Sequence, residues 1–208
     1  MDRPTRTAAL SAALLGGALA TALVPAVAGA QARGLVAPRW RFEAAAVIPE
    51  PTYAEDGAGG GVYGGLAPTL GATAVWQAGR RGIAEVGLRA SSSSISVQTG
   101  GTARDAGRAL QLDLVAGLGL ALGDRVALRG GGGLSMLRGD DAVAPFRAGN
   151  DSPWHLAGEG GLLVRLARTR PIGLALTGHF MRLGAAAVED PVAEGTLTRF
   201  IVGVTYGG

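Results

Sequence analysis

The 208-residue chain contains no cysteine, no lysine and few aromatic residues, which make up 5% of the sequence. Without cysteine the protein has no disulfide bond and no thiolate ligand for a metal. Its net charge of +3 is too small to indicate nucleic-acid binding. Although 48% of the residues are hydrophobic, no apolar run of 18 or more residues follows the N-terminal region, so the sequence predicts no transmembrane helix there.

The N-terminal region has the features of a bacterial export signal. Arg3 and Arg6 supply positive charge, and an apolar stretch follows at residues 8–27. Small residues then form an A-x-A cleavage site at residues 28–30, and a second such arrangement lies at residues 30–32. An uncleaved membrane anchor is the alternative, but the spacing of the small residues favours cleavage.

Cleavage would divide the chain into a signal peptide, residues 1–30, and a mature protein, residues 31–208, whose length suits one domain. Glycine is abundant, with 36 residues in the whole sequence. Glycine destabilises an ordinary strand, but in a closed barrel it permits curvature and leaves room for interior side chains. A disordered glycine-rich chain is disfavoured because leucine, valine and alanine recur at regular spacing.

Between Arg39 and Tyr206, apolar residues alternate with small or polar residues in eight segments. In the clearest segment, residues 110–122, leucine or alanine occupies every even position and Asp113 lies on the opposite face. A helix would distribute these leucines around its circumference, whereas a strand places them all on one face. The predicted strands cover residues 39–48, 69–77, about 84–90, 110–122, 125–137, 154–166, 171–183 and 196–206.

The connections between these segments alternate strictly between long and short. The long connections span residues 49–68, 93–107, 138–153 and 184–195, and the short ones span residues 78–82, 123–124 and 167–170. This alternation is typical of a transmembrane barrel with one rim outside the cell and the other in the periplasm. The sequence therefore predicts an all-β fold, an eight-stranded antiparallel up-and-down transmembrane β-barrel with both termini on the short-turn side.

Three aromatic residues, Trp40, Trp76 and Tyr206, fall next to the short turns and are predicted to form a membrane-interface girdle. Nearly all of the mature sequence resembles, in pattern, the small eight-stranded outer-membrane barrels, namely the OmpA transmembrane domain and its OmpX-like relatives. The closing segment, residues 198–206, resembles the aromatic-ended last strand that the outer-membrane insertion machinery reads, although two glycines follow it. The resemblance implies a place in the cell outer membrane, in contact with its lipid and lipopolysaccharide.

The inward face of the predicted barrel is charged, with five arginines and four acids. These residues are Arg41, Glu43, Glu85, Arg89, Asp113, Arg129, Glu159, Arg165 and Arg199. Eight strands enclose an interior just wide enough for side chains to fill, so the sequence predicts a salt-bridged plug. The alternative is a narrow lumen, which inward glycines would favour. Those glycines are Gly87, Gly117, Gly119, Gly131 and Gly161.

The two histidines, His155 and His179, both face inward by register, and Glu159 is expected opposite or diagonal to His179. A carboxylate beside a histidine can prepare it for acid–base work. Some outer-membrane barrels that modify lipid A use a histidine with a serine, so these three residues are the catalytic candidates. No serine flanks His179 in the sequence, and two histidines are too few for a zinc site. The favoured interpretation is therefore a histidine that makes its hydrogen bonds within the polar core and has no catalytic role. The sequence predicts no metal and no cofactor.

The long loops carry no catalytic motif. Residues 138–140 spell the adhesion tripeptide Arg-Gly-Asp. Because these three residue types are common in the chain, we attribute the tripeptide to chance. Asp140, Asp141 and Asp151 are expected to keep their loop soluble rather than to gather a cation. The sequence thus predicts a non-enzymatic outer-membrane protein with a structural or surface-interaction role and a surface ligand for the loops. The alternatives are a narrow passive channel for small solutes and a lipid A-modifying enzyme centred on His179.

Overall fold

The computed structural model describes residues 37–48, 52–55, 60–140, 154–167, 170–182 and 196–208. The predicted signal peptide, most of the third long connection and all of the fourth lie outside these residues. Within the described part of the chain, no helix is long and apolar enough to cross a membrane.

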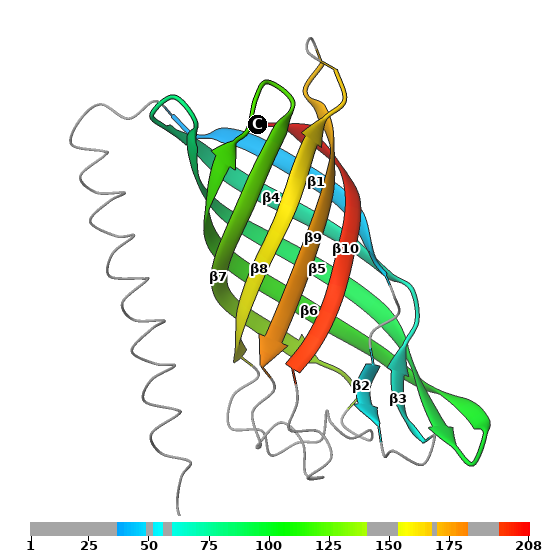
Figure 1. The fold of residues 1–208 in the computed structure, drawn as a ribbon. Coiled ribbons are helices and arrows are strands. Elements are labelled where there is room, and N and C mark those ends of the chain that lie inside the picture. Colours follow the sequence, from blue (N-terminus) through cyan, green and yellow to red (C-terminus); the bar gives the residue numbers. More distant parts are fainter. Residues whose placement is uncertain (1–36, 49–51, 56–59, 141–153, 168–169, 183–195) are drawn as a thin grey trace, which may run out of the picture. The chain divides into compact units, whose positions relative to one another are not determined.

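Ten strands form one antiparallel sheet (Figure 1). They are β1 (Arg39–Ile48), β2 (Thr52–Glu55), β3 (Gly61–Gly64), β4 (Ala67–Ala78), β5 (Gly82–Thr99), β6 (Thr102–Ala121), β7 (Val126–Arg138), β8 (Trp154–Arg165), β9 (Ile172–Arg182) and β10 (Thr196–Gly207). Eight of them pair in a closed ring, in the order β1, β4, β5, β6, β7, β8, β9, β10 and back to β1. The predicted eight-stranded antiparallel barrel is confirmed.

The ring closes where the first strand meets the last. Phe42 of β1 lies opposite Tyr206 of β10, and Ile48 lies opposite Phe200 six residue pairs further along the same ladder. On its other side β1 pairs with β4. Closure gives each of the eight strands two hydrogen-bonded neighbours, which a sheet in hydrocarbon requires because no water is present to satisfy its edges.

The two faces of the sheet differ as the alternation predicted. On β6, Leu114 and Leu118 are exposed on the outer face, whereas Gln111, Asp113 and Val115 are buried inside. The same division holds around the ring, so the outer face is a continuous apolar surface. Among its most exposed side chains are Leu70, Leu88, Leu110, Leu128, Leu176, Phe180, Phe200 and Val204.

The predicted long connection at residues 93–107 is wrong. β5 continues to Thr99 and β6 begins at Thr102, so the two strands are joined by Gly100 and Gly101 alone. Both glycines have positive φ angles, of 57° and 82°, as a two-residue hairpin turn demands. The hairpin extends well past the other strands (Figure 1). Its serine-rich outward face gave no apolar alternation, and for that reason the sequence pattern missed it.

The predicted connection at residues 49–68 also contains strands. Here β2 pairs with β3, and β3 pairs with the far half of β5, where Val62 lies opposite Val97. β3 and β4 thus lie one after the other along β5, separated by Gly65 and Leu66. The sheet formed by β2, β3, β5 and β6 continues beyond the closed ring.

Glycines on β7 show how tightly the barrel curves. A Cβ on the inward Gly133 would collide with the carbonyl oxygen of Leu114 and lie 2.9 Å from the Cα of Val115. On the outward Gly132, the nearest atom would be a carbonyl oxygen at 3.4 Å, which is an ordinary contact. The inward glycine therefore lets neighbouring strands approach on the concave side.

Candidate functional site in the barrel interior

The barrel interior contains a ladder of buried ion pairs that begins on β1. Arg41 donates from Nη2 to Oε2 of Glu85 on β5, at 2.6 Å. The other oxygen of Glu85 accepts from Nη1 of Arg129 on β7, at 3.4 Å. Arg129 also reaches Oε1 of Glu159 on β8, at 3.3 Å, and donates to the hydroxyl of Thr177 at 2.9 Å. Two carboxylates and two guanidinium groups thus cross the lumen in alternation.

The ladder continues through Arg89 to β10. Arg89 donates to Oε2 of Glu159 at 2.9 Å and lies 3.8 Å from Oδ2 of Asp113. Arg199 donates to the same Asp113 oxygen at 2.5 Å. Counting Glu43, which is also buried, the described interior holds four arginines and four acids. The balance of charge fits an enclosed polar core, in which an unpaired ion would cost several kcal/mol.

Two members of the predicted interior network stand apart from this ladder. Glu43 is only 6% exposed, yet its Oε1 atom has no hydrogen-bond partner among the described residues. Arg165 lies exposed at the end of β8, opposite Gly173, so the structure places it outside the ion-pair ladder. The barrel interior ends before this position, and inward register alone did not reveal that.

A polar cluster surrounds His179. Arg199 donates from Nε to Nδ1 of His179 at 3.3 Å, and the hydroxyl of Ser135 lies 3.3 Å from Nε2. Asp113 lies 3.5 Å from the same Nε2 atom. Ser135 and Gln111 both donate to Oδ1 of Asp113, Gln111 at 2.8 Å. Asp113 therefore accepts hydrogen bonds from its own strand, from β7 and from β10, and is the centre of the cluster.

This arrangement brings a serine, a histidine and an aspartate together, which the sequence did not predict. Ser135 and His179 lie on β7 and β9, two strands that are separated by β8. The sequence placed both residues inward, but a contact across a strand depends on the curvature of the closed barrel. Ser135 is therefore the residue that sequence reasoning missed.

The hydrogen bonds of His179 decide what it can do chemically. A guanidinium group can only donate, so Nδ1 must accept from Arg199. The proton of a neutral imidazole then lies on Nε2, toward Ser135 and Asp113. A general base for Ser135 would instead need a free lone pair on that nitrogen. All three side chains are at most 1% exposed, so the cluster is a satisfied polar core.

The other catalytic candidates take different partners. Glu159 lies opposite His179 in the β8–β9 register, as expected, but its two oxygens contact Arg89 and Arg129. His155 is buried opposite Ser135 on the neighbouring strand. The carboxylate beside His179 is therefore that of Asp113, and the three candidates do not converge on one reactive centre.

A small cavity adjoins the ladder on the side of β4, β5 and β6. Gly71, Gly87 and Gly117 line it, together with Glu85 and Arg89. It holds about 20 Å³ of room for the centre of a water molecule. Since one water needs roughly 10–15 Å³ on this measure, the cavity accommodates one or two waters.

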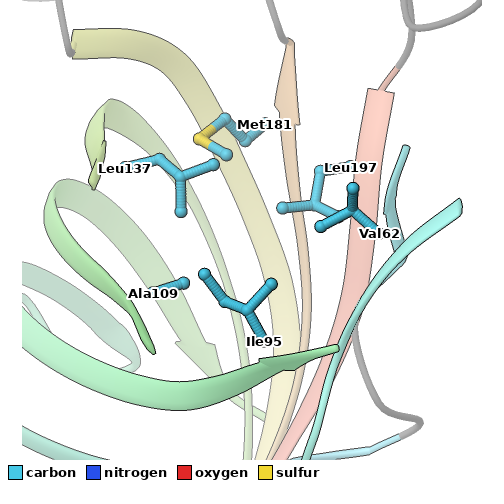
Figure 2. Close-up of a cluster of buried hydrophobic side chains, with 6 residues drawn as sticks. All are labelled: Val62, Ile95, Ala109, Leu137, Met181 and Leu197. Atoms are coloured by element: carbon cyan, nitrogen blue, oxygen red, sulfur yellow. The ribbon is translucent and has the colours of Figure 1, made fainter. Parts of the chain in front are cut away.

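A cluster of buried apolar side chains lies on the loop side of the ladder. Its members come from several strands (Figure 2). It consists of Val62, Ile95, Ala109, Leu137, Met181 and Leu197, and we refer to it as the mouth cluster. On several strands a member of this cluster occupies the inward position next to a polar interior residue. Met181 lies two residues after His179, and Leu197 lies two residues before Arg199. Met181 and Ile95 are at most 1% exposed. The lumen is thus closed by packed apolar side chains as well as by ion pairs.

No protein-family model and no curated protein matches the chain. Solved structures do match it. The outer membrane protein Ail of Yersinia pestis, in a phospholipid bilayer nanodisc, covers 83% of this chain and 100% of its own, with 11% identity and a TM-score of 0.52. OprG of Pseudomonas aeruginosa covers 83% of this chain and 96% of its own, with 17% identity and a TM-score of 0.48. The chain has the fold of the small outer-membrane β-barrels.

In this outer-membrane barrel fold, the predicted girdle residues lie at one rim. Trp40 and Tyr206 are 55% and 61% exposed on the outer face, and they lie near one another because Gly208 donates a backbone hydrogen bond to Trp40. Trp76 is half-buried near the end of β4, opposite Ala84. The structure thus places all three at the short-turn end.

Proposed function

We propose that the protein is a non-enzymatic, integral outer-membrane barrel whose role is structural or lies in surface interaction. The closed and filled lumen is the observation that carries this proposal. An ion-pair ladder and the mouth cluster fill the interior in succession, so little of it remains for a solute or a substrate. The apolar outer face suits lipid, and the extended sheet beyond the ring offers a surface for a ligand.

The β5–β6 hairpin supplies most of that surface. β4 pairs with β5 only as far as Ser91, and β7 pairs with β6 only from Leu110, so residues between these points lie beyond the ring. At a rise of about 3.3 Å per residue, the eight residues of β5 that follow Ser91 span roughly 26 Å. Arg104, Asp105 and Arg108 are exposed there. The hairpin therefore presents charged groups beyond the level at which the barrel is closed.

Shortening this hairpin tests the surface role. We expect that replacing residues 97–104 by a two-residue Asn-Gly turn abolishes the surface adhesion or envelope-stress phenotype of the intact protein. The barrel itself should survive, which unchanged heat-modifiable migration in SDS gels would show. Gly123→Ala in the β6–β7 turn on the other rim, where a new Cβ meets open space, is the control and should leave the phenotype intact. If a full deletion strain shows no phenotype under any stress or adhesion assay, the proposal loses its content.

The alternative of a narrow channel is favoured only by the water-sized cavity beside Gly71 and Gly87. We expect no steady conductance in planar bilayers and no swelling of liposomes that contain the protein. Steady single-channel steps would support the channel instead, and they should then grow in Met181→Ala, which removes a large side chain from the mouth cluster.

The alternative of a lipid A-modifying enzyme is favoured only by the proximity of Ser135 to His179. Because the imidazole proton faces this serine, we expect lipid A mass spectra to be identical in strains with and without the gene. A modification that depends on the gene, and is lost in both Ser135→Ala and His179→Ala, would replace the present proposal.

A further inference from the structure

The rim that carries the short turns is rich in exposed arginines. Within the described part of this rim, they are Arg39, Arg80, Arg81, Arg125, Arg165 and Arg170. The one acid among those described residues is Asp124. A single carboxylate cannot balance six guanidinium groups, so this rim carries a strong positive charge although the interior is balanced.

The arginines are spread around the rim rather than gathered at one point. Arg80 and Arg81 lie in the β4–β5 turn, Arg125 in the β6–β7 turn and Arg170 in the β8–β9 turn. Arg39 begins β1. Each of the three short turns and the first strand thus contributes, which surrounds the barrel with positive charge.

A backbone contact brings two of these arginines side by side. The amide of Arg165, at the end of β8, donates to the carbonyl oxygen of Arg125 in the β6–β7 turn at 2.7 Å. Two arginines at directly adjacent positions repel each other unless an anion lies between them. The opposite rim differs, since Asp105 lies beside Arg104 on the β5–β6 hairpin.

The arginines lie immediately next to the lipid-facing surface. Arg39 precedes the exposed Trp40, Arg165 precedes the exposed Leu166, and Arg80 follows Trp76 by four residues. At about 3.3 Å per residue, these side chains begin within roughly 15 Å of the apolar belt, at the level of lipid headgroups. Arginine matches phosphate well because its planar group can donate two parallel hydrogen bonds.

We propose that this arginine rim binds the phosphate groups of anionic phospholipids in the leaflet that the short turns face. The inference rests on the proposed place of the barrel in the outer membrane. The arginines are distributed around the barrel, which fits a surrounding ring of lipid. A single docked macromolecule would instead need the arginines on one side of the barrel. The rim therefore selects anionic headgroups from a mixed leaflet.

Tryptophan quenching tests this selection directly. The chain has three tryptophans, and Trp154→Phe leaves Trp40 and Trp76, which both lie at the arginine rim. This variant is placed in vesicles of phosphatidylcholine and phosphatidylglycerol in which one lipid or the other is brominated. We expect brominated phosphatidylglycerol to quench as if enriched about fivefold over its mole fraction, a preference equivalent to about 1 kcal/mol. Added salt should reduce the preference because the arginines are exposed.

Charge removal shows whether the arginines cause the preference. In the same background, the combined variant R80Q, R81Q and R125Q should lose most of the enrichment. The matched control R104Q, R108Q and R138Q removes the same charge from the opposite rim and should keep it. If both lipids quench according to their mole fraction, or if both triple variants behave alike, the inference is overturned while insertion still holds.

The remaining outcomes separate this inference from its foundation. If neither brominated lipid quenches, the barrel does not lie in the bilayer and the proposed function fails with it. If lipids quench without preference but purified peptidoglycan co-sediments the protein, and R80Q with R81Q abolishes that, the rim binds the cell wall rather than lipid.

Discussion

The inner and outer faces of the same strands make very different demands on their side chains. Inside, Asp113 has specific partners on several strands, and its removal would take one carboxylate partner away from both Arg199 and Arg89. Outside, the neighbouring Leu114 faces lipid and needs only to be apolar. The comparison teaches that specificity in this barrel resides in the interior, whereas the exterior requires a general property shared by many residues.

The largest difference between the faces should appear at these two adjacent positions. Asp113→Ala should lower the free energy of unfolding by about 3–5 kcal/mol, because it leaves buried cations uncompensated. Leu114→Ala should lower the free energy of unfolding by about 1–2 kcal/mol, since it removes only the free energy gained when an apolar side chain leaves water for lipid. Urea unfolding in lipid vesicles measures both values. An equal or larger cost for Leu114→Ala would contradict the comparison.

Two neighbouring glycines of β7 sharpen the comparison without any charge. Gly133→Ala should cost about 1–3 kcal/mol because its new methyl group meets the backbone of β6. Gly132→Ala places its methyl group on the open outer face and should change stability by about 0.5 kcal/mol or less. The same unfolding assay applies, and a greater loss in Gly132→Ala would mean that strand approach does not limit the curvature.

The smallest effect is expected where the interior ends. Arg129 and Arg165 share the inward face by register, but only Arg129 is buried in ion pairs. Arg165→Gln should leave the unfolding free energy within about 0.5 kcal/mol of the parent value. Arg129→Gln should cost about 3 kcal/mol or more, because Glu85 and Glu159 lose a common partner. Similar losses in both variants would contradict this account, because they would mean that the ion-pair ladder includes Arg165 at the short-turn rim.

The sequence predicted the structure well where the bilayer imposes a pattern. The bounds of β1 match the prediction, and the alternation at residues 110–122 identified both faces of β6. The prediction was wrong at residues 93–107 because a hairpin beyond the bilayer has no reason to be apolar on its outer face. The serines at 91–94 alternate between buried and less buried positions without any change in residue type.

The interior was predicted only in part. Register alone placed Arg89, Asp113 and Glu159 inside, but which carboxylate meets which cation depends on how far the closed barrel is staggered. The contact between Ser135 and His179, across an intervening strand, follows from that curvature. The mouth cluster was missed because Val62 belongs to a short strand inside a predicted loop.

Ring closure between β1 and β10 underlies the whole account, and engineered cysteines test it most directly. Ala44 and Val204 are directly opposed in this ladder, and the protein has no cysteine of its own. The double variant A44C/V204C in native membranes should form an intramolecular disulfide under mild oxidation, since paired strand residues lie within disulfide range. A44C/L118C, with its second cysteine on β6, should not. Failure of A44C/V204C to cross-link in membrane-embedded protein would show that the barrel is not closed as described.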